Sequence, residues 1–521
     1  MKLSFDFISK MYNNRNSYAE IFSPQELEAI HVNSNLEEII KDLIKRRKFI
    51  LLTGNPGDGK THLIRCIEPY LKKYNTFIEL DINEVADHQA FIVELTAALN
   101  NKRPALIAIN EYPLYELLKS MGNAFPFYDQ IEKIKSNSLV YGDEFKVDYG
   151  SLQVAIIDLN NRNLLNISTL GTAFNKLLTS VSPCESCSSG DICVHNQNAK
   201  SLSNDEVQKR VVKLISLLGN IGSHAVMRDI LGLIAFILTA GKKCASLNAD
   251  AIGYSYFNLL FNGNNTLFKE LSALDPANIS HPIIDEQLWN GNLKEGWMLE
   301  GIEKSPSDIE DSDEAMSLFI SLKRKYFFEH VDGEKLFNLY PKELLSFLKL
   351  IKESNDDQTD IIQKIVLSIN RYYNPKETEN QKLFIWNNHS YEARNYPDTI
   401  ISNSSFPFHN MKVQAPKLPK FLMNMEYSPQ HFLFRVEDYK TNENIDLIVN
   451  YDLYRMLMLI ASGYPPQILP DNHKFTLNRF MSQLSATQSR VQTNEFTIRS
   501  LKNNTTRKII IKDNKYLIKN R

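Results

Sequence analysis

The sequence predicts an α/β fold in which a parallel β-sheet comes first, followed by a helical region and a mixed α+β C-terminal domain. Four short apolar runs alternate with helical patterns, at residues 48–53, 76–82, 104–109 and 152–157. Runs that are apolar throughout are typical of strands buried on both faces, and their alternation with helices is typical of a parallel sheet. Ligands bind such sheets at the carboxyl ends of the strands. We therefore expect functional residues directly after these runs.

The first apolar run leads into a glycine-rich turn and then into a helical pattern. The turn has the pattern G-x-x-x-x-G-K-T of a phosphate-binding P-loop. It consists of Gly54, Asn55, Pro56, Gly57, Asp58, Gly59, Lys60 and Thr61, with His62 next. Glycines let the N–H groups of such a turn point together at a phosphate chain, beside the N-terminus of the following helix. Lys60 would reach the β- and γ-phosphates and Thr61 would hold Mg²⁺. A chance glycine turn is the alternative.

The third apolar run ends in the polar pair Asn110 and Glu111, and it resembles the Walker B strand of P-loop ATPases. One strand comes between it and the P-loop strand, as in the division that contains the AAA+ proteins. The resemblance implies a P-loop NTPase (AAA+-like) sheet with a helical lid, in which Glu111 polarises the attacking water. Asn110 departs from the family, which usually has Asp to hold the Mg²⁺ shell. An amide brings no charge, so hydrolysis is affected more than nucleotide binding. Asp81 is a substitute acid, and a simple strand-to-turn exit is the alternative.

The fourth apolar run ends in Asp158-Leu159-Asn160-Asn161-Arg162, which resembles a sensor-1 strand. In P-loop ATPases a polar residue at this place reads the γ-phosphate and orients water. Asn160 is the residue expected to do so here, with Asn161 beside it. An Asn-rich turn without a catalytic role is an equally good interpretation.

Arg228 lies near the start of a helical pattern in the predicted lid, where AAA+ proteins place a sensor-2 arginine that touches the γ-phosphate. A local ion pair with Asp229 or Glu206 is the alternative. An arginine finger that acts on a neighbouring subunit is not singled out by the sequence, because Arg162 and Arg324 both qualify.

A cysteine-rich segment interrupts the predicted lid. Its spacing is C-x-x-C-x5-C-x-H, formed by Cys184, Cys187, Cys193 and His195. Thiolates and an imidazole in so short a segment suit tetrahedral Zn²⁺, and a complete set of four protein ligands implies a structural ion. Free thiols or a redox pair are the alternatives. The other two cysteines, Cys66 and Cys244, are predicted to be small buried side chains.

The composition of the 521-residue chain limits its location and partners. The net charge of −2 gives no overall field that would attract nucleic acid or a membrane. No apolar stretch is long enough to span a bilayer, and no secretory signal is visible. Five cysteines, three of them clustered, favour a reducing cytoplasm. From Arg499 onward there are eight Lys or Arg residues and one acid, Asp513. This basic segment can contact DNA or only guard an edge strand.

The patterns divide the chain into four predicted regions. They are the P-loop ATPase core at 1–165, a helical lid with the Cys/His segment at 166–245, a helical domain at 246–375 and a mixed α+β domain at 376–521. The last boundary rests on a turn-rich stretch at 374–410.

Together these features resemble the ATPase subunit of DNA-phosphorothioation-dependent restriction systems. The resemblance is carried by the glycine-rich turn, Ala108–Glu111, Asp158–Arg162, the cysteine segment, the region around Tyr451–Tyr454 and the chain length. It implies a bacterial antiviral defence protein that works with other restriction subunits and couples ATP turnover to attack on DNA lacking the sulfur mark. The sequence displays no nuclease motif, so cleavage would belong to a partner. Oligomeric state stays open.

Two functions compete at this point. The first is an ATP-hydrolysing motor or switch that acts on DNA or on a DNA-bound partner, with ATP, Mg²⁺ and a structural Zn²⁺ as cofactors. The second is a nucleotide-binding scaffold that hydrolyses little. Asn110 favours the scaffold, whereas Glu111, Asn160 and Arg228 favour the motor or switch. A P-loop kinase is a weaker third interpretation, because no acceptor site is identifiable.

Overall fold

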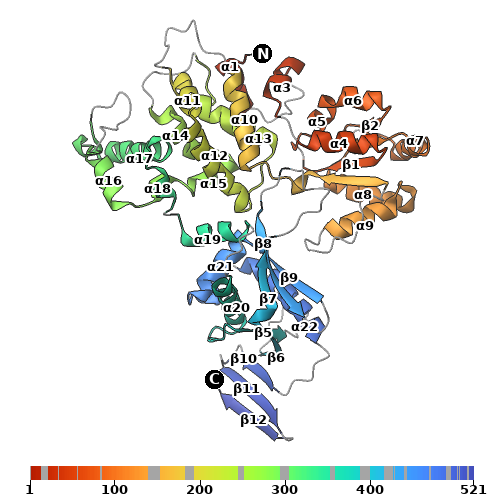
Figure 1. Cartoon of the computed structure of the whole chain (residues 1–521), viewed down its shortest axis with the longest axis vertical. Helices are drawn as coiled ribbons and strands as arrows, with labels where there is room; N and C mark the ends of the chain where they lie inside the picture. The colour runs from red at the N-terminus through yellow and green to blue at the C-terminus, as the bar shows by residue number, and fades with distance from the viewer. Residues whose placement is uncertain are drawn as a thin grey trace. The chain divides into compact units, whose positions relative to one another are not determined.

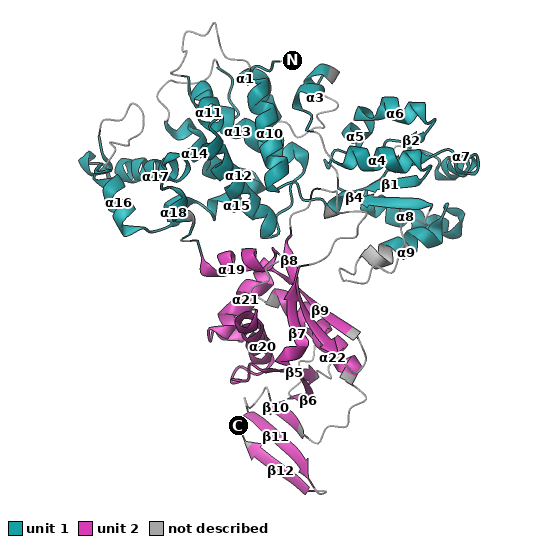
Figure 2. Cartoon of the chain, viewed as in Figure 1, with its two compact units in different colours: residues 1–340, 417–428 teal, residues 341–416, 429–521 magenta. Residues whose placement is uncertain are grey.

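The chain forms two compact units, residues 1–340 with 417–428 and residues 341–416 with 429–521 (Figures 1 and 2). The computed structural model describes residues 2–12, 22–32, 35–55, 57–82, 85–138, 153–181, 193–244, 252–293, 304–338, 340–352, 358–387, 399–415, 426, 429–438, 443–468, 471–488, 495–500, 503, 505–512 and 515–520. Pro56, Cys184 and Cys187 therefore lie outside the described residues, as does the side chain of Asn161.

A four-stranded parallel sheet organises the first part of unit 1, in the order β2-β3-β1-β4. Its strands are β1 (Phe49–Thr53), β2 (Phe77–Glu79), β3 (Ala105–Ala108) and β4 (Val154–Asp158). Every residue of β1 and β3 is buried, as expected for central strands covered on both faces. The predicted mixed α/β class and parallel sheet are confirmed.

The order of the strands corrects one expectation. β3 pairs directly with β1, with Phe49 opposite Ala105 and Leu52 opposite Ala108. β2 comes between these strands in the sequence, but it lies on the far side of β3. The prediction of a strand between the P-loop strand and the Walker B strand is therefore wrong for the described sheet. Order along the chain does not fix order in a sheet, because each crossover can place the next strand on either side.

Helices cover both faces of the sheet (Figure 1). Side chains alternate between the faces of a strand, so Ile50 and Leu52 pack with one helical layer and Phe49 and Leu51 with the other. The first layer is α4 (Asn35–Lys45), α5 (Lys60–Cys66) and α6 (Glu68–Lys73). The second is α7 (His88–Asn100), α8 (Glu111–Met121) and α9 (Tyr128–Ser138).

The rest of unit 1 is helical. Its central helix is α13 (Met227–Thr239), whose residues from Ile230 to Thr239 are all buried. The other helices are α1 (Phe5–Tyr12), α3 (Pro24–Ile30), α10 (Ile167–Ser180), α11 (Val194–Leu202), α12 (Asp205–Asn220), α14 (Tyr256–Asn262), α15 (Thr266–Ser272), α16 (Pro282–Trp289), α17 (Ser312–Glu329) and α18 (Glu334–Phe337). Within the described ranges, no helix combines the length and apolarity needed to cross a membrane.

Unit 2 mixes helices with two antiparallel sheets. One sheet has the order β12-β11-β10-β6-β5 and the other β7-β8-β9. The helices α19 and α20, which fall in the predicted region 246–375, belong to this unit. Its elements are α19 (Lys342–Leu350), α20 (Thr359–Tyr373), β5 (Lys382–Asn387), β6 (Thr399–Pro407), β7 (Met411–Gln414), β8 (His431–Asp438), β9 (Glu443–Asn450), α21 (Tyr451–Ala461), α22 (Lys474–Gln488), β10 (Glu495–Ser500), β11 (Thr505–Lys512) and β12 (Lys515–Asn520).

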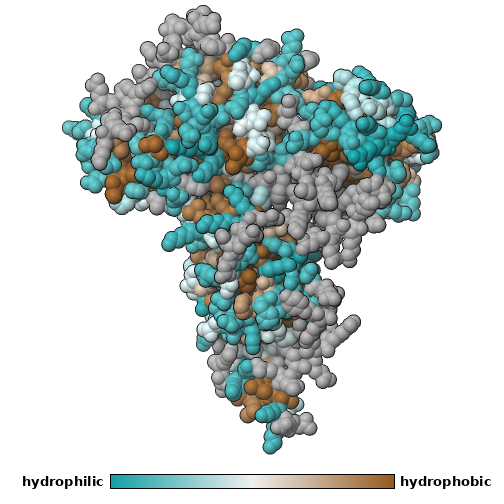
Figure 3. Space-filling model, viewed as in Figure 1, coloured by the Kyte–Doolittle hydropathy of each residue, from teal (hydrophilic) through white to brown (hydrophobic). Residues whose placement is uncertain are grey.

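The basic C-terminal segment forms the end of the five-stranded sheet. The sequence of residues 495–512 has the pattern of two strands joined by a turn around Asn503 and predicts a hairpin. β10 and β11 pair antiparallel, with Glu495 opposite Ile510, so this hairpin is confirmed. β12 adds an outer strand on which Tyr516, Leu517 and Ile518 are exposed. Figure 3 shows a hydrophobic patch at this end of the molecule. Lys515 and Lys519 belong to the same strand, in keeping with charges that guard an edge.

Candidate functional site

A cavity of about 400 Å³ opens at the carboxyl end of the parallel sheet. Its walls come from the loop after β1, from the ends of β2 and β3, from the segment after α3 and from the start of α13. The predicted site residues that line it are Gly57, Asp58, Gly59, Lys60, Thr61, His62, Asn110 and Arg228. Asp81, the substitute acid, lines it as well. Residues from widely separated parts of the sequence thus meet where a parallel sheet binds its ligand.

The loop from Gly54 to Thr61, called the glycine loop below, depends on glycine and on one buried carboxylate. Gly54, Gly57 and Gly59 have φ values of 148°, 97° and 84°, a region that other residues adopt only with strain. The Asp58 side chain is buried inside the turn and accepts the Asn55 N–H at 2.6 Å. A Cβ atom on Gly54 would lie 2.5 Å from the Asp58 carboxylate. The loop is therefore wrapped closely around Asp58.

Lys60 lies folded over this loop. Its Nζ donates to the carbonyl oxygens of Gly54 at 3.1 Å and Asn55 at 2.8 Å. Burial lowers the pKa of the Lys60 ammonium, and the negative charges of Asp58, Asp81 and Asp158 oppose this shift. The ammonium is half-buried beside the cavity, so an anion in the cavity would meet a partly desolvated positive charge.

Arg228 reaches the glycine loop from the start of α13. A Cβ atom on Gly57 would lie 3.1 Å from a guanidinium nitrogen of Arg228, so the two groups are in close contact. Asp229 accepts the Val226 N–H at 3.0 Å and caps α13. The other acid considered from the sequence, Glu206, pairs with Lys209 at 3.4 Å. The arginine is thus placed at the cavity by the start of its helix.

His224 also joins the segment before α13 to the glycine loop. Its Nε2 lies 3.7 Å from Asp58 Oδ1, and the interaction with Asp58 raises the pKa of His224. A group with a raised pKa in the folded state stabilises the fold fully below its unfolded pKa of about 6.5. That contribution disappears as pH rises through the higher folded value.

We therefore expect His224→Gln to lower the melting temperature more at pH 6 than at pH 8. The measurement is thermal unfolding of both proteins at the two pH values. His88→Gln is the control, because His88 is exposed at the start of α7 and should show no such pH dependence. An equal loss at both pH values would contradict a charged His224–Asp58 contact.

Glu111 and Asn160 meet although they follow different strands. The Asn160 amide donates to Glu111 Oε2 at 3.2 Å, and the Asn160 backbone N–H is held by Asp158 Oδ1 at 3.0 Å. Glu111 is exposed at the first turn of α8, and the Asn160 Oδ1 atom is buried without a hydrogen-bond partner among the described residues. The two predicted residues therefore form one pair, outside the direct lining of the cavity.

The two arginines considered as fingers are both engaged within unit 1. Arg162 is buried and donates from Nε to Glu426 at 2.8 Å. Arg324 donates two hydrogen bonds to the buried carboxylate of Asp275, from Nε and from a terminal nitrogen, and it donates a third to Asn258 at 3.1 Å. Buried intramolecular ion pairs do not fit a side chain that is presented to a neighbouring subunit.

Of the predicted zinc ligands, Cys193 and His195 are described. The His195 ring is fully buried, with Nε2 3.1 Å from the Thr239 carbonyl oxygen and Nδ1 3.7 Å from Cys244 Sγ. Burial lowers the pKa of His195. A carbonyl only accepts, so Nε2 carries the proton and Nδ1 faces Cys244. Zinc binding by this segment stays a prediction. Cys244 is half-buried, so its predicted burial is only partial.

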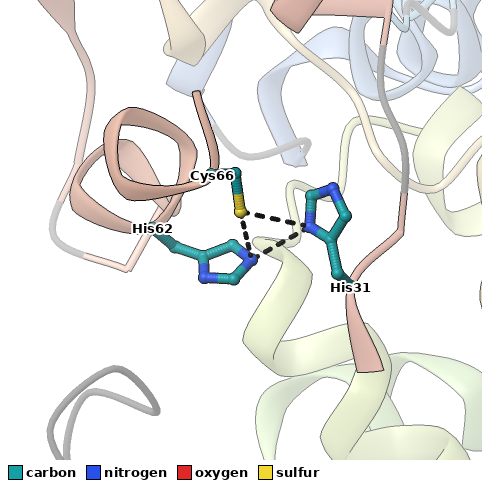
Figure 4. Close-up of side chains that lie close together, drawn as sticks. All are labelled: His31, His62 and Cys66. Carbon is teal, nitrogen blue, oxygen red and sulfur yellow. Dashed lines mark hydrogen bonds between the residues drawn. The ribbon is translucent and has the colours of Figure 1, made fainter. Parts of the chain in front are cut away.

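A second cluster of histidine and cysteine was missed in the sequence. The His62 ring, on α5, points toward His31 and Cys66 (Figure 4). Burial lowers the pKa of His62 to about 4, and desolvation of the sulfur beside the rings raises the pKa of Cys66 to about 11. Cys66 as a residue is exposed, so its predicted burial is wrong. The spacing of four between His62 and Cys66 was a signal for one helix face, whereas nothing local indicated His31.

Comparisons with known proteins add no further assignment. The sequence matches no family model, and it has no significant similarity to a curated protein or to a solved structure.

Proposed function

We propose that unit 1 binds ATP with Mg²⁺ in this cavity and hydrolyses it. The observation that carries the proposal is the meeting of the glycine loop, the Lys60 ammonium and the Arg228 guanidinium at the carboxyl end of a parallel sheet. The cavity volume of about 400 Å³ falls within the usual range for small-molecule sites, about 300–1,000 Å³. Two cations and a turn of backbone N–H groups suit a polyphosphate.

In this proposal the glycine loop wraps around the phosphate chain. The Lys60 ammonium then donates hydrogen bonds to phosphate oxygens in place of the carbonyl oxygens of Gly54 and Asn55. Arg228 contacts the terminal phosphate from the start of α13. The Thr61 hydroxyl and Asp81 provide oxygen atoms of the kind that Mg²⁺ prefers. When bound, Mg²⁺ would neutralise charge on the phosphates.

The hydrolytic step is assigned to the Glu111–Asn160 pair. The amide of Asn160 donates to one carboxylate oxygen of Glu111 and orients this carboxylate, which would accept a proton from the attacking water. The pair lies at the ends of β3 and β4, beside the strand that precedes the glycine loop. Because β3 is the direct neighbour of β1, the proposal rests on the loop and its cations, not on membership of the AAA+ division.

The second candidate is a nucleotide-binding scaffold with little turnover. The observation that favours it is Asn110, an uncharged residue that lines the cavity where the family usually has an acid. In a scaffold, ATP binding itself would be the signal, and the bound ATP would hold the glycine loop and α13 together.

The discriminating experiment measures ATP hydrolysis by the full chain, with and without DNA, in wild type, Glu111→Gln and Glu116→Gln. We expect Glu111→Gln to reduce turnover by about 10²–10⁴-fold, the usual contribution of a general base, with ATP binding retained. Glu116 is exposed on the same helix, so Glu116→Gln should retain full activity. Binding without turnover in the wild type would support the scaffold, and a folded chain that does not bind ATP would overturn both candidates.

A wider role in the cell rests on the resemblance to the ATPase subunit of phosphorothioation-dependent restriction systems. We propose that this ATPase is a cytoplasmic subunit of a bacterial restriction complex, in which partner subunits cut DNA that lacks the sulfur mark. DNA would reach it through those partners or through the basic C-terminal segment. Normal protection against foreign DNA by cells carrying Lys60→Ala would contradict this role.

A further inference from the structure

We propose that His31, His62 and Cys66 form a binding site for a transition-metal ion of the Zn²⁺ class, separate from the cysteine segment at 184–195. Their side chains point toward one another from two parts of unit 1 (Figure 4). One ligand atom from each residue lies within 4.8 Å of the other two. The site does not depend on the proposed ATPase function.

The distances between the three ligand atoms fit a tetrahedral ion. His31 Nδ1 lies 3.0 Å from His62 Nε2, and Cys66 Sγ lies 3.7 Å from the first nitrogen and 3.5 Å from the second. Zinc–nitrogen and zinc–sulfur bonds of about 2.05 and 2.3 Å at tetrahedral angles separate two nitrogens by about 3.3 Å, and nitrogen from sulfur by about 3.6 Å. Only the two imidazoles need to move apart, by a few tenths of an ångström.

The local structure explains why the ligand atoms converge. His62 and Cys66 lie four residues apart on α5, so they share one face of the helix. His31 is the C-cap residue that directly follows α3. Glu37 Oε1 lies 3.0 Å from His31 Nε2. An ionised carboxylate accepts, so Nε2 carries the proton and the Nδ1 lone pair faces the cluster. This carboxylate–histidine arrangement is the usual outer support of a metal-bound imidazole.

The ligand types select the ion. Two imidazoles and one thiolate suit Zn²⁺ and related transition metals, whereas Mg²⁺ and Ca²⁺ prefer oxygen atoms. Three protein ligands leave a fourth position for water or another oxygen ligand. His31 and His62 line the same cavity as Lys60 and Thr61, so this fourth position is reached from the cavity or, past the exposed Cys66, from solvent.

Binding of the ion would couple two segments that the sequence separates. Helix α5 begins with Lys60 and Thr61 and carries His62 and Cys66, while His31 directly follows α3. An ion held by all three residues would fix α5 against the segment after α3. Because α5 begins at the end of the glycine loop, the ion would also hold that end of the loop in place.

The test uses Co²⁺ as the probe and the full chain in which Cys184, Cys187 and Cys193 are replaced by Ser, so that the predicted zinc segment cannot contribute. We expect one Co²⁺ per chain, with near-ultraviolet absorption from sulfur-to-cobalt charge transfer and the strong visible bands of a four-coordinate ion. Cys66→Ser in this background should abolish the charge-transfer band. Cys244→Ser, the matched control, should retain it.

A second pair of variants tests the imidazoles. His62→Asn should weaken Co²⁺ binding by at least about tenfold, in line with the loss of a ligand or its support, and His88→Asn should not. Far-ultraviolet circular dichroism establishes that each variant is folded. A folded triple-serine chain without the charge-transfer band, or a band that survives Cys66→Ser, would overturn the proposal. As a check with all other cysteines present, Cys66→Ser alone should lower bound zinc by one ion per chain.

Discussion

Lys60→Ala is expected to weaken ATP binding by about 10- to 150-fold, which corresponds to about 1.5–3 kcal/mol for a hydrogen bond to a charged group. Lys60 carries a half-buried ammonium that already bonds two oxygens of the glycine loop. Phosphate oxygens would replace those carbonyl oxygens and bring a full negative charge. The measurement is a titration with a fluorescent ATP analogue in the presence of Mg²⁺.

The control for this prediction is Lys73→Ala. Lys73 is exposed on α6 and does not line the cavity, so its removal lowers the net charge equally without touching the site. Both variants should keep their far-ultraviolet circular dichroism, although Lys60→Ala loses its two bonds to the loop. If a folded Lys60→Ala chain binds ATP as tightly as wild type, the proposed phosphate site is wrong.

Arg324→Met is expected to destabilise unit 1 by about 3–5 kcal/mol, the usual cost of removing one partner from a buried ion pair. The Arg324 and Asp275 side chains are only 11% and 8% exposed, and their closest atoms are 2.5 Å apart. The guanidinium also lies 5.0 Å from the Phe261 ring centroid. The substitution keeps much of the apolar volume but leaves the Asp275 carboxylate buried without its cation. Chemical denaturation of the variant and wild type measures the loss.

A double variant separates charge from packing. Asp275 accepts the Ala277 N–H at 2.9 Å, a bond that asparagine can also accept, so Arg324→Met with Asp275→Asn should recover part of the lost stability. The comparison also addresses the arginine-finger interpretation. The opposite result would be an Arg324→Met chain that keeps its stability but loses ATP turnover only when it is mixed with other subunits. That result would favour a role of Arg324 across a subunit interface over a role in the buried ion pair.

Much of the fold could be predicted from local sequence patterns. The apolar runs predicted β1 and β3, because strands buried on both faces have no polar side chains to interrupt them. The hairpin around Asn503 was predictable because both of its strands and its turn lie within a few residues. The glycine loop was also visible, since its backbone conformation requires glycine at fixed spacing.

Contacts between distant residues were not predictable in the same way. The pairing of β3 with β1 depends on the crossover and not on either strand. The His31–His62–Cys66 cluster joins residues 31 positions apart, and the Arg162–Glu426 pair joins residues 264 apart. No single stretch contains both members of such a contact, so periodicity and motif spacing cannot reveal it.

Glu426 has a practical consequence for dissecting the chain. Unit 1 is discontinuous, because it includes residues 417–428 after the first stretch of unit 2. A fragment cut after residue 340 would contain the sheet, the glycine loop and α13, yet it would lack the only carboxylate paired with Arg162 in the described residues. The backbone would also lose the bond from the Asn163 N–H to the Glu426 carbonyl oxygen at 3.0 Å. The fragment would therefore leave the Arg162 guanidinium in the cavity wall without this carboxylate, and low activity of such a fragment would be a product of the cut.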